Sequence, residues 1–153
     1  MYSFSFETAT IPFNTVRLCL PPFPILKMWT VSQSERKCII KPDIVCDFTQ
    51  LPFPDNTFAL VVFDPPHLTG AKETSWLVKK YGKLDDNWPQ MLHDGFAECM
   101  RVLKPDGVLI FKWSEYDIPA EKVWKAINQK PLFGHHSGRK SKTFWGCFMK
   151  GAI

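Results

Sequence analysis

The stretch Leu60-Val61-Val62-Phe63-Asp64-Pro65-Pro66-His67 decides the fold. Four apolar residues in a row are typical of a strand that is buried on both faces in a parallel sheet. Two prolines must end this strand, because proline has no N–H for the sheet and holds the preceding residue extended. An acid, two rigid carbonyl groups and a ring are therefore expected at the carboxyl end of a central strand. In open α/β sheets that edge is where ligands bind.

The tetrapeptide Asp64-Pro65-Pro66-His67 resembles the (Asp/Asn/Ser)-Pro-Pro-(aromatic) motif of S-adenosylmethionine-dependent methyltransferases that modify planar amino groups. Such a nitrogen is a poor nucleophile because its lone pair is delocalised into the ring. The resemblance implies that the Asp64 carboxylate and the Pro65 carbonyl accept its two hydrogens and aim the lone pair at the methyl group. The His67 ring would stack on the target, so that catalysis is positioning and electrostatics. The alternative is a simple turn after a strand.

Composition places the chain among ordinary globular proteins. Its 153 residues are enough for one domain with a real core, and a net charge of +4 suits an anionic partner without requiring one. Five cysteines without a C-x-x-C pair predict free thiols in a reducing compartment, and the four histidines lack metal-ligand spacing. No run approaches the roughly 18 apolar residues of a membrane span, and the amino terminus does not read as a signal peptide. We expect a cytoplasmic protein without a metal site.

From residue 41 onward the pattern alternates between strands and helices. One helix opens at Pro89 and is expected to bury Leu92, Phe96, Cys99 and Leu103 before the sequence Lys104-Pro105-Asp106-Gly107 stops it. A second helix is expected to be capped near Asp117. A basic turn, Ser137–Lys142, joins the last two strands. The expected order is strand 44–47, strand 57–63, helix from 89, strand 108–113, helix from 117, and strands near 132–133 and 144–149.

Residues 1–40 form an atypical amino-terminal segment. Thr15–Leu20 alternates weakly and is a candidate strand, and the prolines of Pro21-Pro22-Phe23-Pro24 end whatever precedes them. All eight glycines lie at Gly70 or later. The methyltransferase fold normally opens with a strand and a glycine-rich turn, where the backbone approaches the cofactor closely. The absence of early glycines is the main argument against a competent enzyme.

Six segments in this order resemble a family of small class I S-adenosylmethionine-dependent methyltransferases from bacteria and their phages. The resemblance runs from Lys41 to Lys150 and implies an α/β, Rossmann-like, seven-stranded sheet with helices on both faces and incomplete or atypical first strands. The predicted division is an amino-terminal segment 1–40 and a methyltransferase-like domain 41–153. The segments are Lys41-Pro42-Asp43-Ile44-Val45-Cys46-Asp47-Phe48, Leu51-Pro52-Phe53-Pro54-Asp55-Asn56-Thr57-Phe58, Phe63-Asp64-Pro65-Pro66-His67-Leu68, Lys79-Lys80-Tyr81-Gly82-Lys83-Leu84, Glu98-Cys99-Met100-Arg101-Val102-Leu103-Lys104-Pro105-Asp106-Gly107 and Phe111-Lys112-Trp113.

The resemblance also implies residue roles and a cofactor. Asp47, Phe48 and Asp64 would contact S-adenosylmethionine, with the first two beside its adenine. His67 and Trp113 would line the substrate site, and the loop residues Lys79, Lys80 and Tyr81 would contact a substrate such as a nucleic acid, although a solvated loop face is the default interpretation.

Two alternatives to a self-sufficient enzyme stay open. One is a catalytically inactive, truncated binding module that lacks the cofactor loop. The other is a chain that works with a partner chain supplying the missing cofactor-binding half.

Overall fold

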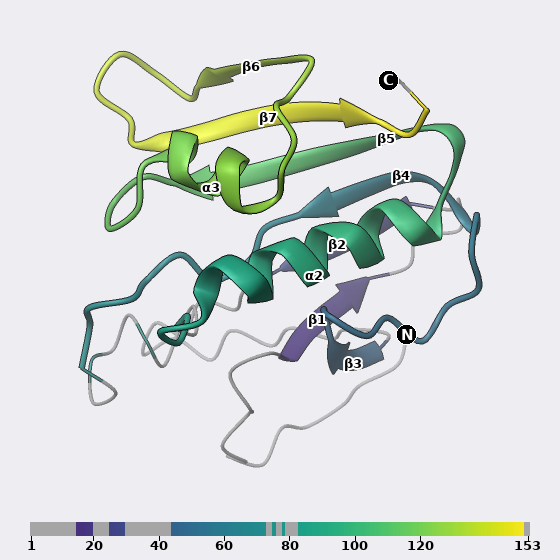
Figure 1. Cartoon of the computed structure of the whole chain (residues 1–153), viewed down its shortest axis with the longest axis horizontal. Helices are drawn as coiled ribbons and strands as arrows, with labels where there is room; N and C mark the ends of the chain where they lie inside the picture. The colour runs from purple at the N-terminus through teal and green to yellow at the C-terminus, as the bar shows by residue number, and fades with distance from the viewer. Residues whose placement is uncertain are drawn as a thin grey trace, which may run out of the picture.

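The structure is a computed structural model that describes residues 15–19, 25–29, 44–72, 75, 78 and 83–151. The described strands form one mixed sheet in the order β3-β1-β2-β4-β5-β7-β6, and the described helices pack against it (Figure 1). This confirms the α/β fold class. The elements are β1 (Thr15–Cys19), β2 (Ile25–Trp29), β3 (Ile44–Asp47), β4 (Phe58–Phe63), α2 (Trp88–Val102), β5 (Leu103–Ser114), α3 (Ala120–Ala126), β6 (Phe133–His136) and β7 (Thr143–Met149).

The strand directions bring several carboxyl ends to one edge of the sheet. Strands β2, β4 and β5 are parallel to one another, whereas β1 is antiparallel to both β2 and β3. Strand β3 therefore runs in the same direction as β4. It follows that Asp47, Asp64 and Ser114, at or just beyond the ends of β3, β4 and β5, all lie along the same edge.

The amino-terminal strands explain why the sequence looked atypical. A doubly wound sheet has the order 3-2-1-4-5-6, but here β1 and β2 have exchanged places. Only five residues, 20–24, join them, and a parallel connection needs a dozen or more. The two strands can therefore only pair as an antiparallel hairpin. The candidate strand at Thr15–Leu20 is confirmed, whereas β2 carries too little alternation to have been predicted.

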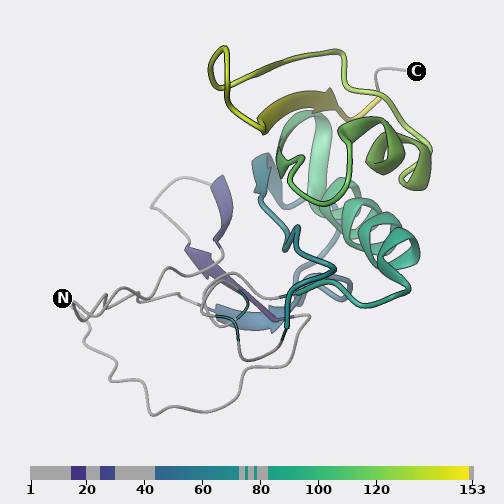
Figure 2. The ribbon, with the colours of Figure 1, turned by 90° about the vertical axis from the view of Figure 1, so that its left-hand side faces the viewer.

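Helices α2 and α3 lie on the same face of β4 and β5, as the view onto the sheet edge shows (Figure 2). Helix α2 begins beside Pro89 and buries Leu92, Phe96 and Cys99, as its spacing predicted. The prediction that Leu103 continues this helical face is wrong: Leu103 is buried, but it is already extended and starts β5, so the helix ends at Val102. The strand predicted from residue 108 therefore begins five residues earlier, at Leu103. Its register with β4 shifts between the pairs Phe58–Leu103 and Leu60–Val108.

The start of α3 corrects one prediction. Asp117 does not cap this helix; its carboxylate Oδ2 accepts the N–H of Thr69 at 2.8 Å instead. The first N–H of the helix, from Ala120, is donated to Glu115 Oε1 at 2.8 Å. A carboxylate from the end of β5 therefore supplies the cap that the sequence assigned to the nearer acid.

The core lies between the sheet and these two helices. On the central strands, Val61, Phe63, Phe111 and Trp113 are fully buried on the helix side. The alternate positions, such as Val62, are only half-buried among the described residues. Strand β4 is therefore completely buried on one face only, whereas the run of four apolar residues predicted burial on both faces. Gly95 of α2 allows close packing here, since a Cβ atom would meet Phe48 Cδ2 at 2.4 Å.

Candidate functional site

The diproline corner is held firmly at the end of β4. Pro65 and Pro66 are buried, and the chain beyond them is tied to two distant segments. The Leu68 carbonyl accepts the N–H of Leu84 at 2.8 Å, and the Thr69 N–H is donated to Asp117 at 2.8 Å. Long-range hydrogen bonds thus fix the direction in which the corner presents its carbonyls and the preceding acid.

The Asp64 carboxylate already holds a nitrogen. Its Oδ2 accepts a hydrogen bond from Lys112 Nζ at 2.6 Å, and the Asp64 side chain is only 19% exposed. Burial raises the pKa of Asp64 above its usual value, while the hydrogen bond and charge of Lys112 act in the opposite direction. The corner therefore combines a desolvated acceptor with a charged nitrogen donor in direct contact.

Sequence reasoning missed the part that Lys112 plays. Lys112 lies in the segment Phe111-Lys112-Trp113, for which the resemblance implies a role of Trp113 alone. The signal was present, because Lys112 is the only charged residue between Val108 and Trp113 in an apolar strand. A charge in such a place needs a partner, and the parallel neighbour β4 ends one residue before an acid. Only the pairing of β4 with β5 shows that Lys112 lies next to Asp64, and this pairing cannot be read from the sequence.

The His67 ring stands beside the core. Its centroid lies 6.4 Å from the Trp113 ring in a nearly edge-to-face arrangement. Burial lowers the pKa of His67, the positive charge of Lys112 lowers it further, and Asp117 opposes both. A ring kept neutral in this way suits stacking better than proton transfer.

The residues expected at the cofactor separate into two kinds. Asp47 is exposed at the end of β3, where its Oδ1 accepts hydrogen bonds from the Thr49 N–H and hydroxyl, each at 2.8 Å. Phe48 has no accessible surface and packs on Phe63 with ring centroids 5.6 Å apart. In this arrangement Phe48 cannot face a ligand, so its ring is a core residue. Of these two residues, only Asp47 has a side chain exposed to solvent.

The residues expected at the substrate show a similar division. Trp113 is also completely buried, and its indole Nε1 donates to the Ile118 carbonyl at 2.9 Å. Its ring supports His67 from behind and has no surface left for a substrate. Lys79, Lys80 and Tyr81 lie outside the residues that the structure describes.

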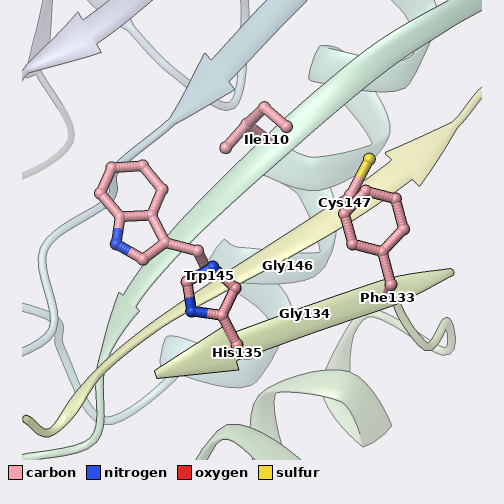
Figure 3. A pocket seen from close by; sticks show the side chains of 7 residues that line it. All are labelled: Ile110, Phe133, Gly134, His135, Trp145, Gly146 and Cys147. Atoms are coloured by element: carbon pink, nitrogen blue, oxygen red, sulfur yellow. The ribbon is translucent and has the colours of Figure 1, made fainter. Parts of the chain in front are cut away.

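An apolar hollow of about 370 Å³ lies on the other face of the sheet (Figure 3). Lys112 connects it to the corner, because its Nζ lies 5.8 Å from the centroid of the Trp145 ring, which lines the hollow. A second, polar hollow lies at the turn between β6 and β7. Neither of these two hollows is lined by Asp47 or Asp64. The first is lined by Ile110, Phe133, Gly134, His135, Trp145, Gly146 and Cys147.

Comparison with known proteins identifies no family for this chain. No family model matches the chain, and no curated protein matches it either. Thirteen solved chains match, among them the crystal structure of the [4+2]-cyclase SpnF, with 20% sequence identity and a TM-score of 0.35. That match covers 59% of this chain and 34% of SpnF, so the chain spans about a third of SpnF's length. A similarity at this level carries no argument about activity.

Metal clusters and membrane-spanning helices are two further kinds of functional feature. Within the described ranges, no group of three or more His, Cys, Asp or Glu side chains is arranged to hold a metal ion. None of the helices in the same ranges has the length and apolar character needed to cross a bilayer.

The lowered pKa of His67 predicts a pH dependence of stability. The usual histidine pKa is about 6.5. As the pH falls through this value, His67 becomes protonated in the unfolded chain but stays neutral in the folded chain, where its pKa is lower. The free energy of unfolding should therefore fall as the pH drops toward the folded-state pKa. Urea unfolding at pH 8 and pH 5.5 should show a smaller pH effect in His67→Phe than in the original chain. His93→Phe, on the exposed side of α2, is the control; an equal change there would contradict the assignment.

Proposed function

We propose that this chain transfers a methyl group from S-adenosylmethionine to a planar amino group, and that the acceptor is a nucleobase. One observation supports this proposal above the others. The half-buried Asp64 carboxylate, at the carboxyl edge of the central strand, accepts a hydrogen bond from the Lys112 nitrogen at 2.6 Å. Because the Asp64 carboxylate accepts a hydrogen bond from the Lys112 ammonium, it can accept one from the amino group of a substrate in the same position.

The residues of the corner divide the work of activating that amine. Asp64 and the Pro65 carbonyl accept its two hydrogens, which draws the nitrogen toward tetrahedral geometry and frees its lone pair. As the nitrogen gains the methyl group it would lose one of these hydrogens as a proton to the Asp64 carboxylate, which passes it to solvent. Lys112 must leave Asp64 when the amine enters, and its half-exposed position, with 36% of the side chain accessible, allows it to turn outward. The neutral His67 ring then stacks on the base. A base in a duplex must first be flipped out, at a cost of a few kcal/mol.

The cofactor side of the site fits in part. When bound, S-adenosylmethionine would supply the activated methyl group. Asp47 and Asp64 lie on the same edge, three strand positions apart, which corresponds to about 14 Å. Asp47 is exposed and could accept hydrogen bonds from the hydroxyl groups of a nucleoside. The usual glycine cradle is missing, however, because no glycine precedes Gly70 in the chain.

The missing cradle favours a second candidate function. A chain that keeps the acceptor corner without a cofactor turn would act as a methyltransferase-like binding module. The ion pair between Asp64 and Lys112 suits that role too, since it satisfies both charges without a ligand. A partner chain that supplies the cofactor-binding half would restore catalysis to the same corner.

Calorimetric titration with S-adenosylmethionine separates these candidates. A self-sufficient enzyme should bind S-adenosylmethionine with a dissociation constant in the micromolar range, measured from the heat of each injection. Asp47→Ala should weaken this binding. A control variant, Asp86→Ala, changes an exposed acid before α2 and should bind normally. No heat with the isolated chain would overturn the self-sufficient enzyme and leave the binding module or the partnered chain.

A further inference from the structure

The charges of this chain are divided very unevenly. The last 32 residues, 122–153, contain no aspartate or glutamate and seven lysines and arginines. The other 121 residues carry twelve lysines and arginines against all fifteen acids. The overall charge of +4 conceals a basic carboxyl-terminal segment attached to a mildly acidic body. Charge asymmetry of this kind is typical of chains that bind a polyanion.

Three of these cations lie in the turn between β6 and β7. Arg139, Lys140 and Lys142 are all exposed, and none takes part in the ion pairs found among the described residues. The polar hollow at this turn, of about 480 Å³, is lined by Arg139 with His136, Gly138 and Ser141. Arg139 lines the hollow itself, and Lys140 and Lys142 lie in the same turn. The acid beside this turn, Glu115, is paired with His136 and not with these three cations, so their charges are available to an anionic ligand.

The turn lies at the same edge of the sheet as the diproline corner. Strand β7 is antiparallel to β5, and Thr143 pairs with Ser114 at the end of β5. The residues just before Thr143 therefore extend beyond the carboxyl end of β5, next to the strand that Asp64 follows. In Figure 1 the β6–β7 connection and the end of β4 lie on the same side of the molecule.

The turn is also fixed in place. The Trp145 indole donates to Ser137 Oγ at 2.8 Å, and the Ser137 N–H is donated to the Thr143 carbonyl at 2.9 Å. The Glu115 N–H is donated to the Lys142 carbonyl at 2.8 Å, which ties the turn to the end of β5. A fixed turn presents its charges without a large loss of conformational entropy on binding.

An aromatic ring accompanies the cations. Lys142 Nζ lies 4.7 Å from the centroid of the Tyr116 ring, and Tyr116 is 68% exposed. Exposed aromatic rings beside lysine and arginine are a recurrent arrangement on surfaces that bind single-stranded nucleic acids, where the ring stacks on a base. Acidic proteins and anionic membranes offer negative charge but no base for such a ring.

We infer that the β6–β7 turn, with Arg139, Lys140 and Lys142, binds the phosphate backbone of a nucleic acid and brings it to the corner at Asp64. This inference rests on the proposed function for the identity of the substrate, and it assigns the backbone contact to a part of the chain that the resemblance did not indicate. The three cations neutralise successive phosphates, Tyr116 stacks on an unpaired base, and the neighbouring corner receives the target base.

Binding of a fluorescein-labelled 20-nucleotide DNA, single- or double-stranded, tests the inference by fluorescence anisotropy without cofactor. The triple variant Arg139→Ala/Lys140→Ala/Lys142→Ala should bind about tenfold or more weakly. The slope of log K against log salt should become shallower by about 2 to 3, since each lost phosphate contact removes 0.7 to 0.9. The matched control is Lys104→Ala/Lys125→Ala/Lys130→Ala, which removes the same charge from exposed positions away from this turn. Thermal unfolding verifies that both variants fold.

The outcomes separate this inference from the proposed function. An equal loss in both variants, no binding by the original chain, or binding to anionic phospholipid vesicles in preference to DNA would each overturn the inference. If DNA binds through the turn while S-adenosylmethionine does not bind, the inference about the turn is supported and the proposal of a self-sufficient methyltransferase is wrong. If S-adenosylmethionine binds but DNA does not, the inference about the turn is wrong, and methyl transfer to a smaller acceptor is supported.

Discussion

Replacing Asp64 by alanine is expected to lower methyl transfer by about 10²- to 10³-fold, the range found when one preorganised polar group at a reacting centre is removed. The variant loses the acceptor that binds Lys112 at 2.6 Å and, in our proposal, the amine. The Pro65 carbonyl remains but cannot hold both hydrogens. The measurement is transfer of labelled methyl groups to DNA or RNA, with thermal unfolding to show that the chain is folded.

Asparagine at position 64 gives a graded comparison. Its side-chain carbonyl keeps one acceptor, and the motif that Asp64-Pro65-Pro66-His67 resembles accepts asparagine at this place. We therefore expect Asp64→Asn to keep more activity than Asp64→Ala. Asp86→Ala, which removes an exposed acid before α2, should leave transfer unchanged. Transfer that survives Asp64→Ala would mean that the amine is activated elsewhere.

The parts of the fold that depend on local pattern could be predicted from the sequence. Helix α2 has a buried face at a spacing of three and four residues, and Pro89 marks its start. The diproline corner ends β4 because of the chemistry of proline itself. The basic turn at Ser137–Lys142 connects β6 and β7 as expected. In each case a few neighbouring residues contain the whole signal.

The parts that depend on pairing between distant segments could not be predicted. Lys112 meets Asp64 only because β4 and β5 are parallel neighbours in one register, in which Phe63 pairs with Phe111. Asp117 binds Thr69 across 48 residues of sequence instead of capping α3. The family resemblance implies that Phe48 contacts a cofactor, yet Gly95 of α2 leaves room for its ring in the core. Long-range packing decided each of these outcomes.

Replacing Trp113 by alanine is expected to lower the free energy of unfolding by about 3 to 5 kcal/mol. Trp113 is fully buried, its ring centroid lies 6.2 Å from that of Phe111, and its indole satisfies the Ile118 carbonyl at 2.9 Å. The substitution leaves a large cavity and an unpaired acceptor. Domains of this size have about 5 to 15 kcal/mol of stability in total, so urea unfolding should show a large shift of the midpoint.

Two further variants decide whether Trp113 is a core residue or a substrate platform. Trp113→Phe keeps most of the buried ring and loses the hydrogen bond to Ile118, so it should cost about 1 to 3 kcal/mol. Phe133→Ala removes a ring that is 68% exposed and should change stability by no more than about 0.5 kcal/mol. A substrate platform would behave in the opposite way, because Trp113→Ala would then abolish transfer while the midpoint stayed in place. The burial of Trp113 behind His67 favours the first result, with activity lost only because the ring that supports the corner has been removed.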